Sequence, residues 1–263
     1  MRRLIFVLST IILFAFVSCT KTLVDGNPIT QSFDVTSDYV TLDVRDAFDV
    51  TVCDTVSQAV VTIGENLMPK VVVEVVNKTL KIYLKPFYTI NTGEAKVILP
   101  YNPDLKEIGM SGAASFRSEF PMVCDKANVV LTGASDCYCD IDADEIDMNL
   151  SGDSYFEGNI DASELDLEMS GASDATLRGQ VTTLDIDLSG ASSIKKTING
   201  SNYGFECDFC KGEMSGGSDA YIHCNSIIKV NLSGASDLHF TGNAFTADSE
   251  TSGASKIIHD VLP

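Results

Sequence analysis

Apolar and polar residues alternate strictly over many short runs of this chain. In the runs 165–169 and 184–188, Leu, Ile or Met occupies every second position, and Asp or Glu occupies the positions between. A period of two places the aliphatic side chains on one face and the acids on the other, as in a half-buried β-strand. No run of comparable length has the spacing of an amphipathic helix. The pattern therefore predicts an all-β protein.

These runs end at a short corner, Ser-Gly-Ala-Ser or a close variant, which occurs eight times. The corner glycines are Gly112, Gly133, Gly152, Gly171, Gly190, Gly216, Gly234 and Gly253, at intervals of 21, 19, 19, 19, 26, 18 and 19 residues. The fourth residue after each glycine is apolar in every copy, namely Phe116, Cys137, Phe156, Ala175, Ile194, Ala220, Leu238 and Ile257. A nearly constant interval is the signature of a repeat architecture.

Each repeat reads as a strand, a tight corner at the glycine, a short strand and a looser turn. One such unit cannot bury its own apolar face, but units stacked about 4.8 Å apart share a continuous core. We therefore predict a single-stranded β-helix, or β-solenoid, with rungs of about 19 residues. Because parallel crossover connections are overwhelmingly right-handed, we expect a right-handed coil.

The N-terminus has the features of a lipoprotein signal peptide over residues 1–18. Two arginines precede an apolar run of about 14 residues, which is shorter than the roughly 20 needed to cross a bilayer. The run ends at Phe16-Val17-Ser18-Cys19, which resembles a bacterial lipobox. We expect lipidation of Cys19 and an outer-membrane lipoprotein, periplasmic or surface-facing, held to the membrane by its lipid alone. Ordinary secretory cleavage with an incidental Cys19 is the alternative.

Three further segments follow the signal peptide. Residues 19–32 are expected to form a flexible tether, and residues 33–105 an irregular β region that caps or continues the solenoid. Within that region the stretch 42–50 matches the repeat in outline, with Asp46 in place of the glycine. Residues 106–259 are expected to form the regular β-helix of eight repeats.

The charge balance excludes some partners. The chain has 18 Lys and Arg against 37 Asp and Glu residues, a net charge of −19, which becomes −21 once Arg2 and Arg3 are removed. This balance argues against nucleic acid and against adhesion to anionic lipid headgroups. Solubility and suppressed end-to-end association are the simple explanation for the acidity. Binding of cations or cationic surfaces is the alternative.

One interval, between Gly190 and Gly216, is seven residues longer than the period. The extra residues lie within 199–210, together with Tyr203, Phe205 and Phe209. Insertions in solenoids form loops on one face, and such loops often carry binding sites. This segment is therefore a candidate contact loop, with neutral length variation as the equal alternative.

Stacking of the repeats also predicts two columns of aspartates. They are Asp136, Asp174, Asp219 and Asp237 three residues after the glycine, and Asp147, Asp166 and Asp185 before it. Stacked carboxylates repel one another unless bridged, and Ca²⁺ accepts such oxygen ligands. Weak Ca²⁺ binding is thus one interpretation. Plain solvated acid is the other, since the Gly-Gly-x-Gly-x-Asp motif of calcium β-rolls is absent. We expect no dedicated metal site and no cofactor.

The remaining candidate chemistry is weak. Cys207 and Cys224 have nearly equal offsets from their glycines, so they are expected on adjacent rungs, where a disulfide could form in an oxidising envelope. A lone Cys-x-x-Cys outside a thioredoxin-like context does not indicate zinc or redox chemistry. The corner serines, such as Ser170 and Ser173, are expected to bond neighbouring backbone rather than act as nucleophiles, because no histidine accompanies them in a fixed register.

The chain resembles a known family at two places. One is the recurrent Leu-Ser-Gly-Ala-Ser-Asp, as at 232–237, and the other is the ordered series 42–52, 65–71, 80–84 and 97–108 upstream of the repeats. Both resemble the putative auto-transporter adhesin head (GIN) domains of Bacteroidetes-type lipoproteins, over residues 33–259. The resemblance implies a β-helix-like fold in the cell envelope and supplies no catalytic residues. The chain departs from the family in its seven cysteines after Cys19 and in the long interval.

These observations favour a non-catalytic adhesin or interaction protein whose partner is a glycan or a surface protein. A polysaccharide-acting β-helix enzyme is one alternative, and an envelope structural or lipid-binding protein is the other. The absence of tryptophan, the usual sugar-stacking platform, weighs against the enzyme. A deep apolar pocket would favour lipid binding. A cleft with carboxylates roughly 5–9.5 Å apart would favour glycoside hydrolysis.

Overall fold

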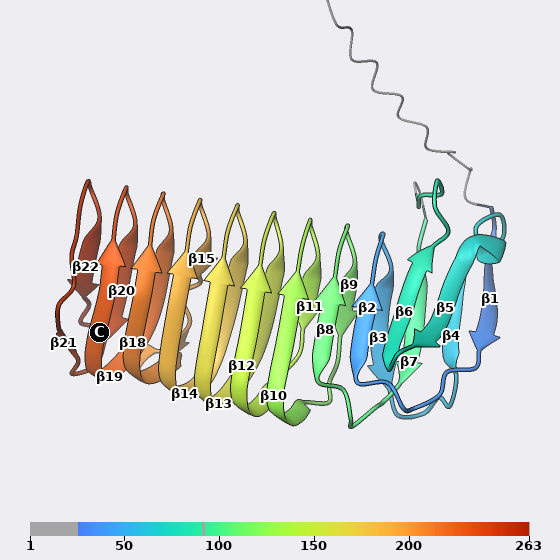
Figure 1. Ribbon diagram of the computed structural model, residues 1–263, viewed down its shortest axis with the longest axis horizontal. Coiled ribbons are helices and arrows are strands. Elements are labelled where there is room, and N and C mark those ends of the chain that lie inside the picture. The colour runs from blue at the N-terminus through green and yellow to red at the C-terminus, as the bar shows by residue number, and fades with distance from the viewer. Residues whose placement is uncertain (1–25, 91–92, 263) are drawn as a thin grey trace, which may run out of the picture.

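The computed structural model describes residues 26–90 and 93–262 of the chain. The chain winds as a right-handed β-solenoid of about eight turns, elongated along the direction in which the rungs stack (Figure 1). The strands of the regular part are β8 (Glu107–Met110), β9 (Ser115–Arg117), β10 (Met122–Leu131), β11 (Asp136–Tyr138), β12 (Ile141–Leu150), β13 (Tyr155–Met169), β14 (Asp174–Leu188), β15 (Ser193–Ile194), β18 (Phe205–Met214), β19 (Asp219–Leu232), β20 (Asp237–Thr241), β21 (Phe245–Thr246) and β22 (Lys256–His259). Within the described residues, no helix is long and apolar enough to cross a membrane.

Neighbouring rungs pair in parallel with a register that repeats the sequence period. Leu165 lies opposite Ile146 on one side and Leu184 on the other, each 19 residues away. Because the register preserves the alternation, the alternating aliphatic residues of the central rungs, such as Leu165 and Leu167, point inward and are buried, while Asp166 between them is exposed. The predicted β-solenoid with rungs of about 19 residues is therefore confirmed.

The core contains a column built from the fourth residue after each corner. The residues stack in the order Phe116, Cys137, Phe156, Ala175, Ile194, Ala220, Leu238 and Ile257. All but Ile257, in the last rung, are fully buried. Large and small side chains alternate along this column, so each large residue fills the space that its smaller neighbours leave.

The corners stack through their backbones. At Gly171 φ is +78°, and a Cβ there would lie 2.6 Å from the carbonyl oxygen of Gly152 in the rung before. That oxygen instead accepts the N–H of Ala172 at 2.7 Å. The hydroxyl of buried Ser173 lies 3.2 Å from the Leu150 carbonyl and 3.1 Å from that of Ser170. Ser173 and Ser236 are thus bonded to backbone, as expected, whereas the buried hydroxyls of Ser154 and Ser192 at the same corner position have no hydrogen-bond partner among the described residues.

The stretch 42–50, which matches the repeat in outline, forms a ninth rung in the N-terminal region. Strands β2 (Thr41–Val44) and β3 (Asp49–Cys53) form a rung that pairs in parallel with β8 and β9. Asp46 turns the corner with φ of +68°, and its carbonyl accepts the N–H of Ala113 at 2.7 Å. Its carboxylate also accepts the Leu84 N–H at 2.7 Å. Aspartate therefore takes the glycine's place and adds a side-chain bond to the next layer.

The strands beyond this rung depart from chain order. The elements are β1 (Pro28–Phe33), β4 (Ala59–Gly64), η1 (Met68–Lys70), β5 (Val71–Val76), β6 (Thr79–Leu84) and β7 (Lys96–Pro100). β6 and β7 pair in parallel with β2 and β3, so the β2–β3 rung lies between two rungs that follow it in sequence. β5 then pairs antiparallel with β6, β4 with β7 and β1 with β4. The antiparallel strands cover the N-terminal end of the solenoid.

One predicted boundary was wrong. Residues 28–32, which the sequence placed in a flexible tether, belong to β1 and pair with β4 from Pro28 opposite Gly64 to Phe33 opposite Ala59. Most of β1 is exposed, so it has little apolar burial to signal a strand. The unpaired backbone groups at the edge of β4 supply its hydrogen bonds instead. The predicted signal peptide and Cys19 lie outside the described residues.

Candidate functional site

The long interval folds into a short hairpin on the flank of the solenoid. β16 (Ile198–Asn199) and β17 (Asn202–Tyr203) pair antiparallel around a turn at Gly200. The hairpin returns to its starting point, because the Gly204 N–H bonds to the Thr197 carbonyl at 2.9 Å. The Thr197 hydroxyl in turn donates to the Leu177 carbonyl at 3.0 Å. The insertion is therefore tied to the rung beneath it.

Tyr203 anchors the hairpin to the C-terminal rungs. Its side chain is only 2% exposed, and its ring packs edge-on against Tyr221 at a centroid distance of 5.6 Å. Its N–H donates to the Thr241 hydroxyl at 3.0 Å, and its own hydroxyl donates to the carboxylate of Asp260. Burial alone would raise the pKa of Asp260, but hydrogen bonds from Tyr203 and His239 lower it. These bonds fix the position of the hairpin.

This arrangement corrects the prediction of an aromatic contact loop. Tyr203 and Phe205 are buried, and Phe209 is the one of the three that is exposed, at 42%. Phe205 lies inward because it begins β18 in the register that also buries Cys207, a pattern that the alternation before Gly216 could have revealed. The aromatics hold the insertion in place, and other residues form the surface beside it.

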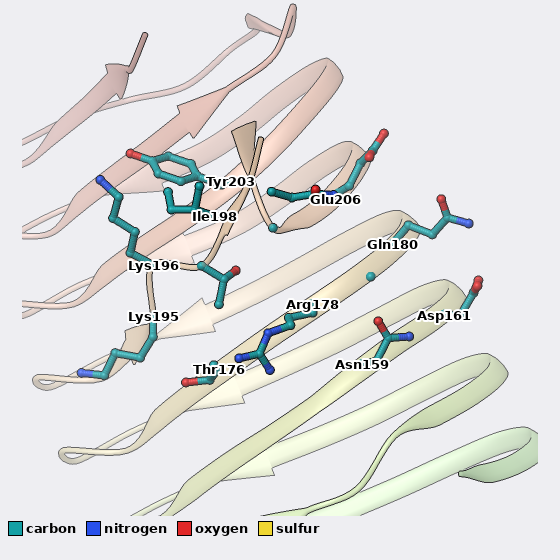
Figure 2. Close-up of a pocket in the computed structure, with 14 residues that line it drawn as sticks. Asn159, Asp161, Thr176, Arg178, Gln180, Lys195, Lys196, Ile198, Tyr203 and Glu206 are labelled. Atoms are coloured by element: carbon teal, nitrogen blue, oxygen red, sulfur yellow. The ribbon is translucent and has the colours of Figure 1, made fainter. Parts of the chain in front are cut away.

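That surface is a groove of about 740 Å³ between the hairpin and the preceding rungs. Its lining is mostly polar, and Figure 2 shows these side chains projecting from successive rungs. The lining residues are Asn159, Asp161, Thr176, Arg178, Gly179, Gln180, Lys195, Lys196, Thr197, Ile198, Asn199, Tyr203, Gly204 and Glu206. The volume is within the range of small-molecule sites, roughly 300–1,000 Å³.

Basic residues gather at one end of the groove. Arg178 pairs with Glu157 at 3.1 Å and Lys195 with Asp174 at 2.8 Å. The ammonium of Lys196 lies 5.3 Å from the centroid of the Tyr203 ring. These residues were not predicted from the sequence. The pair Lys195-Lys196 after the corner at Gly190 could have indicated a basic site, because the chain is otherwise so acidic.

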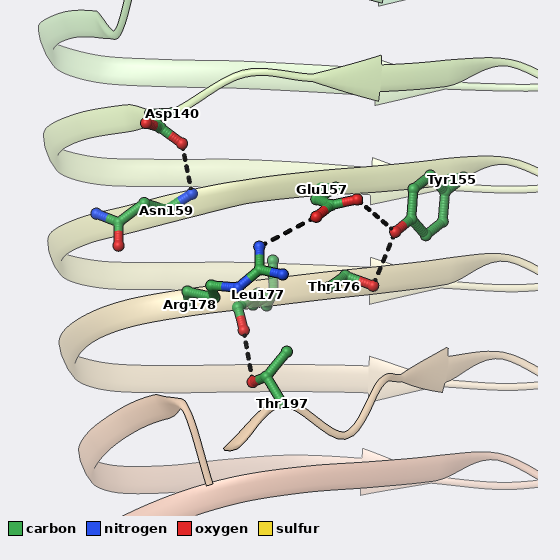
Figure 3. Close-up of polar contacts among 8 residues, drawn as sticks. All are labelled: Asp140, Tyr155, Glu157, Asn159, Thr176, Leu177, Arg178 and Thr197. Atoms are coloured by element: carbon green, nitrogen blue, oxygen red, sulfur yellow. Dashed lines mark hydrogen bonds and ion pairs between the residues drawn. The ribbon is translucent and has the colours of Figure 1, made fainter. Parts of the chain in front are cut away.

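A hydrogen-bond network holds the floor of the groove (Figure 3). The Tyr155 hydroxyl donates to Glu157 at 2.9 Å and lies 3.0 Å from the Thr176 hydroxyl. The bond from Tyr155, together with that from Arg178, lowers the pKa of Glu157 although partial burial opposes the shift. Beside it, the Asn159 N–H donates to Asp140 at 2.8 Å. Arg178 is thereby oriented by a carboxylate that stays ionised.

Two carboxylates, Asp161 and Glu206, lie at the other end of the groove (Figure 2). They occupy the same position two rungs apart, with Gln180 between them. Two rungs correspond to roughly 10 Å, just beyond the separation typical of inverting glycosidases. A general acid is usually enclosed by apolar side chains, whereas both of these carboxylates are exposed. The pair does not form a glycosidase centre of the usual kind.

The two aspartate columns stack in the predicted register. The column of Asp147, Asp166 and Asp185 is flanked by lysines, since Lys126 pairs with Asp147 at 2.8 Å and Lys211 with Asp185 at 2.9 Å. In the other column Tyr155 and Ser193 separate the acids, so only Asp219 and Asp237 are direct neighbours. In the part of the chain that the structure describes, no three His, Cys, Asp or Glu side chains are gathered as metal ligands.

Asp166 is the unpaired carboxylate in the middle of its column, and its replacement by asparagine should stabilise the protein. Burial, followed by the charges of Asp185 and Asp147, raises the pKa of Asp166 above the ordinary aspartate value of 3.8. The folded state therefore binds this proton more tightly than the unfolded state. Stability from this group is present below pH 3.8 and is lost as pH rises through the folded-state pKa.

We expect Asp166→Asn to raise the free energy of unfolding at pH 7 by roughly 0.2–1 kcal/mol and to flatten its decline above pH 4. Urea denaturation at several pH values measures both effects. The matched control is Asp147→Asn, which also removes one acid but leaves Lys126 without one of its two partners and should give no gain. Equal gains from both variants would contradict this account of the column.

Cys207 and Cys224 face each other on adjacent rungs, as predicted. Both thiols are buried and free in the structure, and Cys210 lies buried close by. A hydrogen bond with Cys224, together with burial, raises the pKa of Cys207, so its thiol stays protonated. Adjacent rungs bring Cα atoms within the range that a disulfide requires. The disulfide itself stays a prediction.

Two apolar hollows bear on the lipid-binding alternative. The cavity lined by Tyr39, Leu99 and Phe120 measures about 20 Å³, which is room for about one water. It cannot hold an acyl chain. A hollow of about 640 Å³ over β3, β4 and β7 is larger, and its lining includes Val60 and Ile98.

The chain is similar to known proteins both in its sequence and in its fold. Residues 38–244 match the model of the family described as "Putative auto-transporter adhesin, head GIN domain". The fold is similar to a putative adhesin from Parabacteroides distasonis (TM-score 0.79, 20% identity, 90% of this chain and 98% of that one). It is also similar to a putative adhesin from Parabacteroides merdae (TM-score 0.79, 18% identity, 90% and 98%). A third similar structure is a putative lipid binding protein from Parabacteroides distasonis (TM-score 0.77, 20% identity, 91% and 100%). No curated protein matches the chain.

Proposed function

The chain belongs to the family of putative auto-transporter adhesin head GIN domains, and from this premise we propose that it is an adhesin-like protein of the cell envelope. In this proposal it is lipid-anchored through Cys19, non-catalytic, and binds its partner in the groove beside hairpin β16–β17. The family description and the similar structures named as adhesins support the general role. The groove supports the place of contact.

The observation that carries the proposal is the single long interval of the repeat. Elsewhere the rungs follow one another with nearly constant spacing, but here seven extra residues form a wall beside a groove of about 740 Å³. Tyr203 and Thr197 hold this wall in position with buried hydrogen bonds. A binding surface that is fixed before its ligand arrives loses less conformational entropy on association.

The lining of the groove suits a glycan. Amide and hydroxyl groups of Asn159, Thr176, Gln180 and Asn199 offer both donors and acceptors, as the hydroxyls of a sugar do. Successive rungs present these groups at a regular spacing along the groove, which suits an extended chain of similar units. We therefore favour a glycan over a folded surface protein as the partner.

A binding role without catalysis also fits the side chains nearby. The corner serines are not among the residues that line the groove, and Ser173 and Ser236 are bonded to backbone carbonyls. The carboxylates Asp161 and Glu206 are exposed and roughly 10 Å apart at two rungs' separation. Neither feature has the enclosure that acid–base chemistry on a sugar usually needs.

Removal of the hairpin should abolish binding. The variant lacking residues 198–204 restores a 19-residue interval and joins Thr197 to Phe205, whose chain neighbour Gly204 already lies beside Thr197 with its N–H bonded to the Thr197 carbonyl at 2.9 Å. We expect a glycan and extracellular-matrix array, probed with the chain from Thr20 onward, to give a specific hit that this variant loses. The point variant Gln180→Ala should weaken the hit by about two- to tenfold, the effect of one hydrogen bond.

The matched control is Thr182→Ala on the same strand, outside this groove. It should bind like the wild type, and circular dichroism should show that every variant is folded. A hit that needs Ca²⁺ and survives the deletion would place the contact at the aspartate columns. An array without any hit would contradict adhesion to glycan or matrix.

Lipid contact is the second candidate function. The hollow over β3, β4 and β7 exposes Ile98 and partly exposes Val52 and Val60, and one similar structure is named a putative lipid binding protein. Co-sedimentation of the same soluble chain with phospholipid vesicles tests it. Vesicle binding combined with an empty array would favour this second function over the first.

A further inference from the structure

The groove concentrates basic residues in an otherwise acidic protein. Three of the chain's 18 Lys and Arg residues, namely Arg178, Lys195 and Lys196, are among its 14 lining residues. Figure 2 shows Lys195 and Lys196 at one side of the groove, Arg178 near its middle, and Asp161 and Glu206 on the opposite side. A neutral glycan needs no such separation of charge. The lining therefore indicates a ligand that carries a negative charge at one end.

Lys196 is the residue best placed to bind the negative charge of the ligand. Across residues 26–90 and 93–262 its ammonium group forms no ion pair within 4.0 Å, although its charge is among those that lower the pKa of Asp260 beyond Tyr203. Its ammonium instead lies 5.3 Å from the centroid of the Tyr203 ring, which is itself fixed by Tyr221 and Asp260. A cation held by a ring face keeps its N–H donors available to a ligand. The buried tyrosine thus positions the lysine.

Arg178 and Lys195 can assist because their ion pairs are exposed. Their side chains are 52% and 45% exposed, and ion pairs between exposed groups contribute little stability. A ligand carboxylate can therefore share their N–H donors without a large loss elsewhere. Arg178 presents a planar guanidinium that can bind a carboxylate through two parallel hydrogen bonds.

The aromatic content of the groove also favours a charged ligand. Tyr203 is its only lining aromatic, and that ring is buried against Tyr221 and covered by Lys196. No aromatic face of the lining is therefore free for a sugar to stack on. Recognition has to come from hydrogen bonds and charge, and hydrogen bonds to charged groups are about twice as strong as neutral ones.

The surrounding charge limits how acidic the ligand can be. The chain carries a net charge of −19, and Asp161 and Glu206 border the far end of the groove. A dense polyanion would be repelled by both. Building on the proposed function, we propose that the groove binds a glycan with an isolated carboxylate-bearing sugar whose carboxylate is held at Lys196, with Arg178 and Lys195 as further cations along the lining. Its neutral sugars extend toward Asp161 and Glu206.

The test uses oligosaccharides that each carry one carboxylate, spotted on an array as the free acid and as the neutral methyl ester. Wild-type protein should bind the free acids about tenfold more tightly than their esters, the effect of one charge-assisted hydrogen bond. Lys196→Gln should reduce that preference to about twofold or less, while Lys196→Arg should preserve most of it. Lys229→Gln, an exposed lysine outside the groove, is the matched control and should leave the preference unchanged.

The outcomes separate this inference from the proposed function. If acids and esters bind equally, and deletion of residues 198–204 abolishes both, recognition of a carboxylate is overturned but glycan binding in the groove is supported. Binding of neither form would overturn both. Acidic peptides included on the same array should not bind, and peptide binding that depends on Lys196 would overturn the assignment to a glycan.

Discussion

Replacement of Gly171 by alanine should lower the free energy of unfolding by about 3 kcal/mol or more. Two costs act together at this corner. Its φ of +78° is unfavourable for a residue with a Cβ, and the added carbon would lie 2.6 Å from the Gly152 carbonyl oxygen. That oxygen belongs to the backbone of the preceding rung and already accepts a hydrogen bond, so neither rung can move away without breaking the corner stack.

Two other glycines separate these costs. At Gly217 the nearest atom to an added Cβ is 3.9 Å away and φ is not positive, so Gly217→Ala should change stability by less than about 1 kcal/mol. At Gly200 φ is +61° but nothing lies within 4 Å, so Gly200→Ala should cost only the conformational term, roughly 1–2 kcal/mol. Urea denaturation should find the Gly171 variant least stable, the Gly200 variant intermediate and the Gly217 variant most stable. A Gly171 variant no less stable than the Gly200 variant would show that rung contact is unimportant.

Truncation of Phe156 to alanine should cost about 3–5 kcal/mol, the usual range for a fully buried phenylalanine. Phe156 lies in the core column between two smaller residues, Cys137 and Ala175, neither of which can fill the space it would leave. Because each rung packs on its neighbours, we expect the thermal transition to shift downward as a whole. Differential scanning calorimetry and urea denaturation measure this loss.

The column also offers a compensating change. Adding Ala175→Phe to Phe156→Ala moves the large side chain by one rung while it keeps the total core volume. We expect the double variant to recover about 1–2 kcal/mol of the loss, because volume-conserving changes are tolerated better than cavities. Phe209→Ala, at the exposed position of the same protein, should cost less than about 1 kcal/mol. A double variant less stable than Phe156→Ala alone would show that position 175 cannot accommodate a large side chain even when position 156 is small.

Much of the fold could be predicted from the sequence because every rung repeats the same pattern of alternating apolar and polar residues followed by a glycine corner. The column from Phe116 to Ile257 and the corner at Gly171 each follow from the alignment of eight copies. The same logic identified Asp46 as a corner residue, where aspartate tolerates a positive φ better than most residues. Local alternation and stacking leave little freedom for a different answer.

The candidate site could not be predicted in the same way, because it depends on contacts that occur once. Tyr203 looked like a surface aromatic, yet Thr241 and Asp260, 38 and 57 residues later, bury it and satisfy its polar groups. The groove arises where the hairpin meets strands that come before it in sequence. For the same reason the order of β6 and β7 around the β2–β3 rung was not foreseen, since no repeat specifies it.

The interleaved N-terminal rungs have a consequence for how the chain folds. Pairing β3 with β7 brings Asp49 to Lys96 across 47 residues, and pairing β2 with β8 brings Thr41 to Glu107 across 66, whereas β12, β13 and β14 each pair with the preceding rung across only 19. Loop-closure entropy rises with the length closed, so the costliest ordering steps are those that assemble the cap and dock the first regular rung, β8 and β9, onto it. Once the cap exists, its exposed strand edge templates the next rung, and the solenoid can grow one short closure at a time toward the C-terminus.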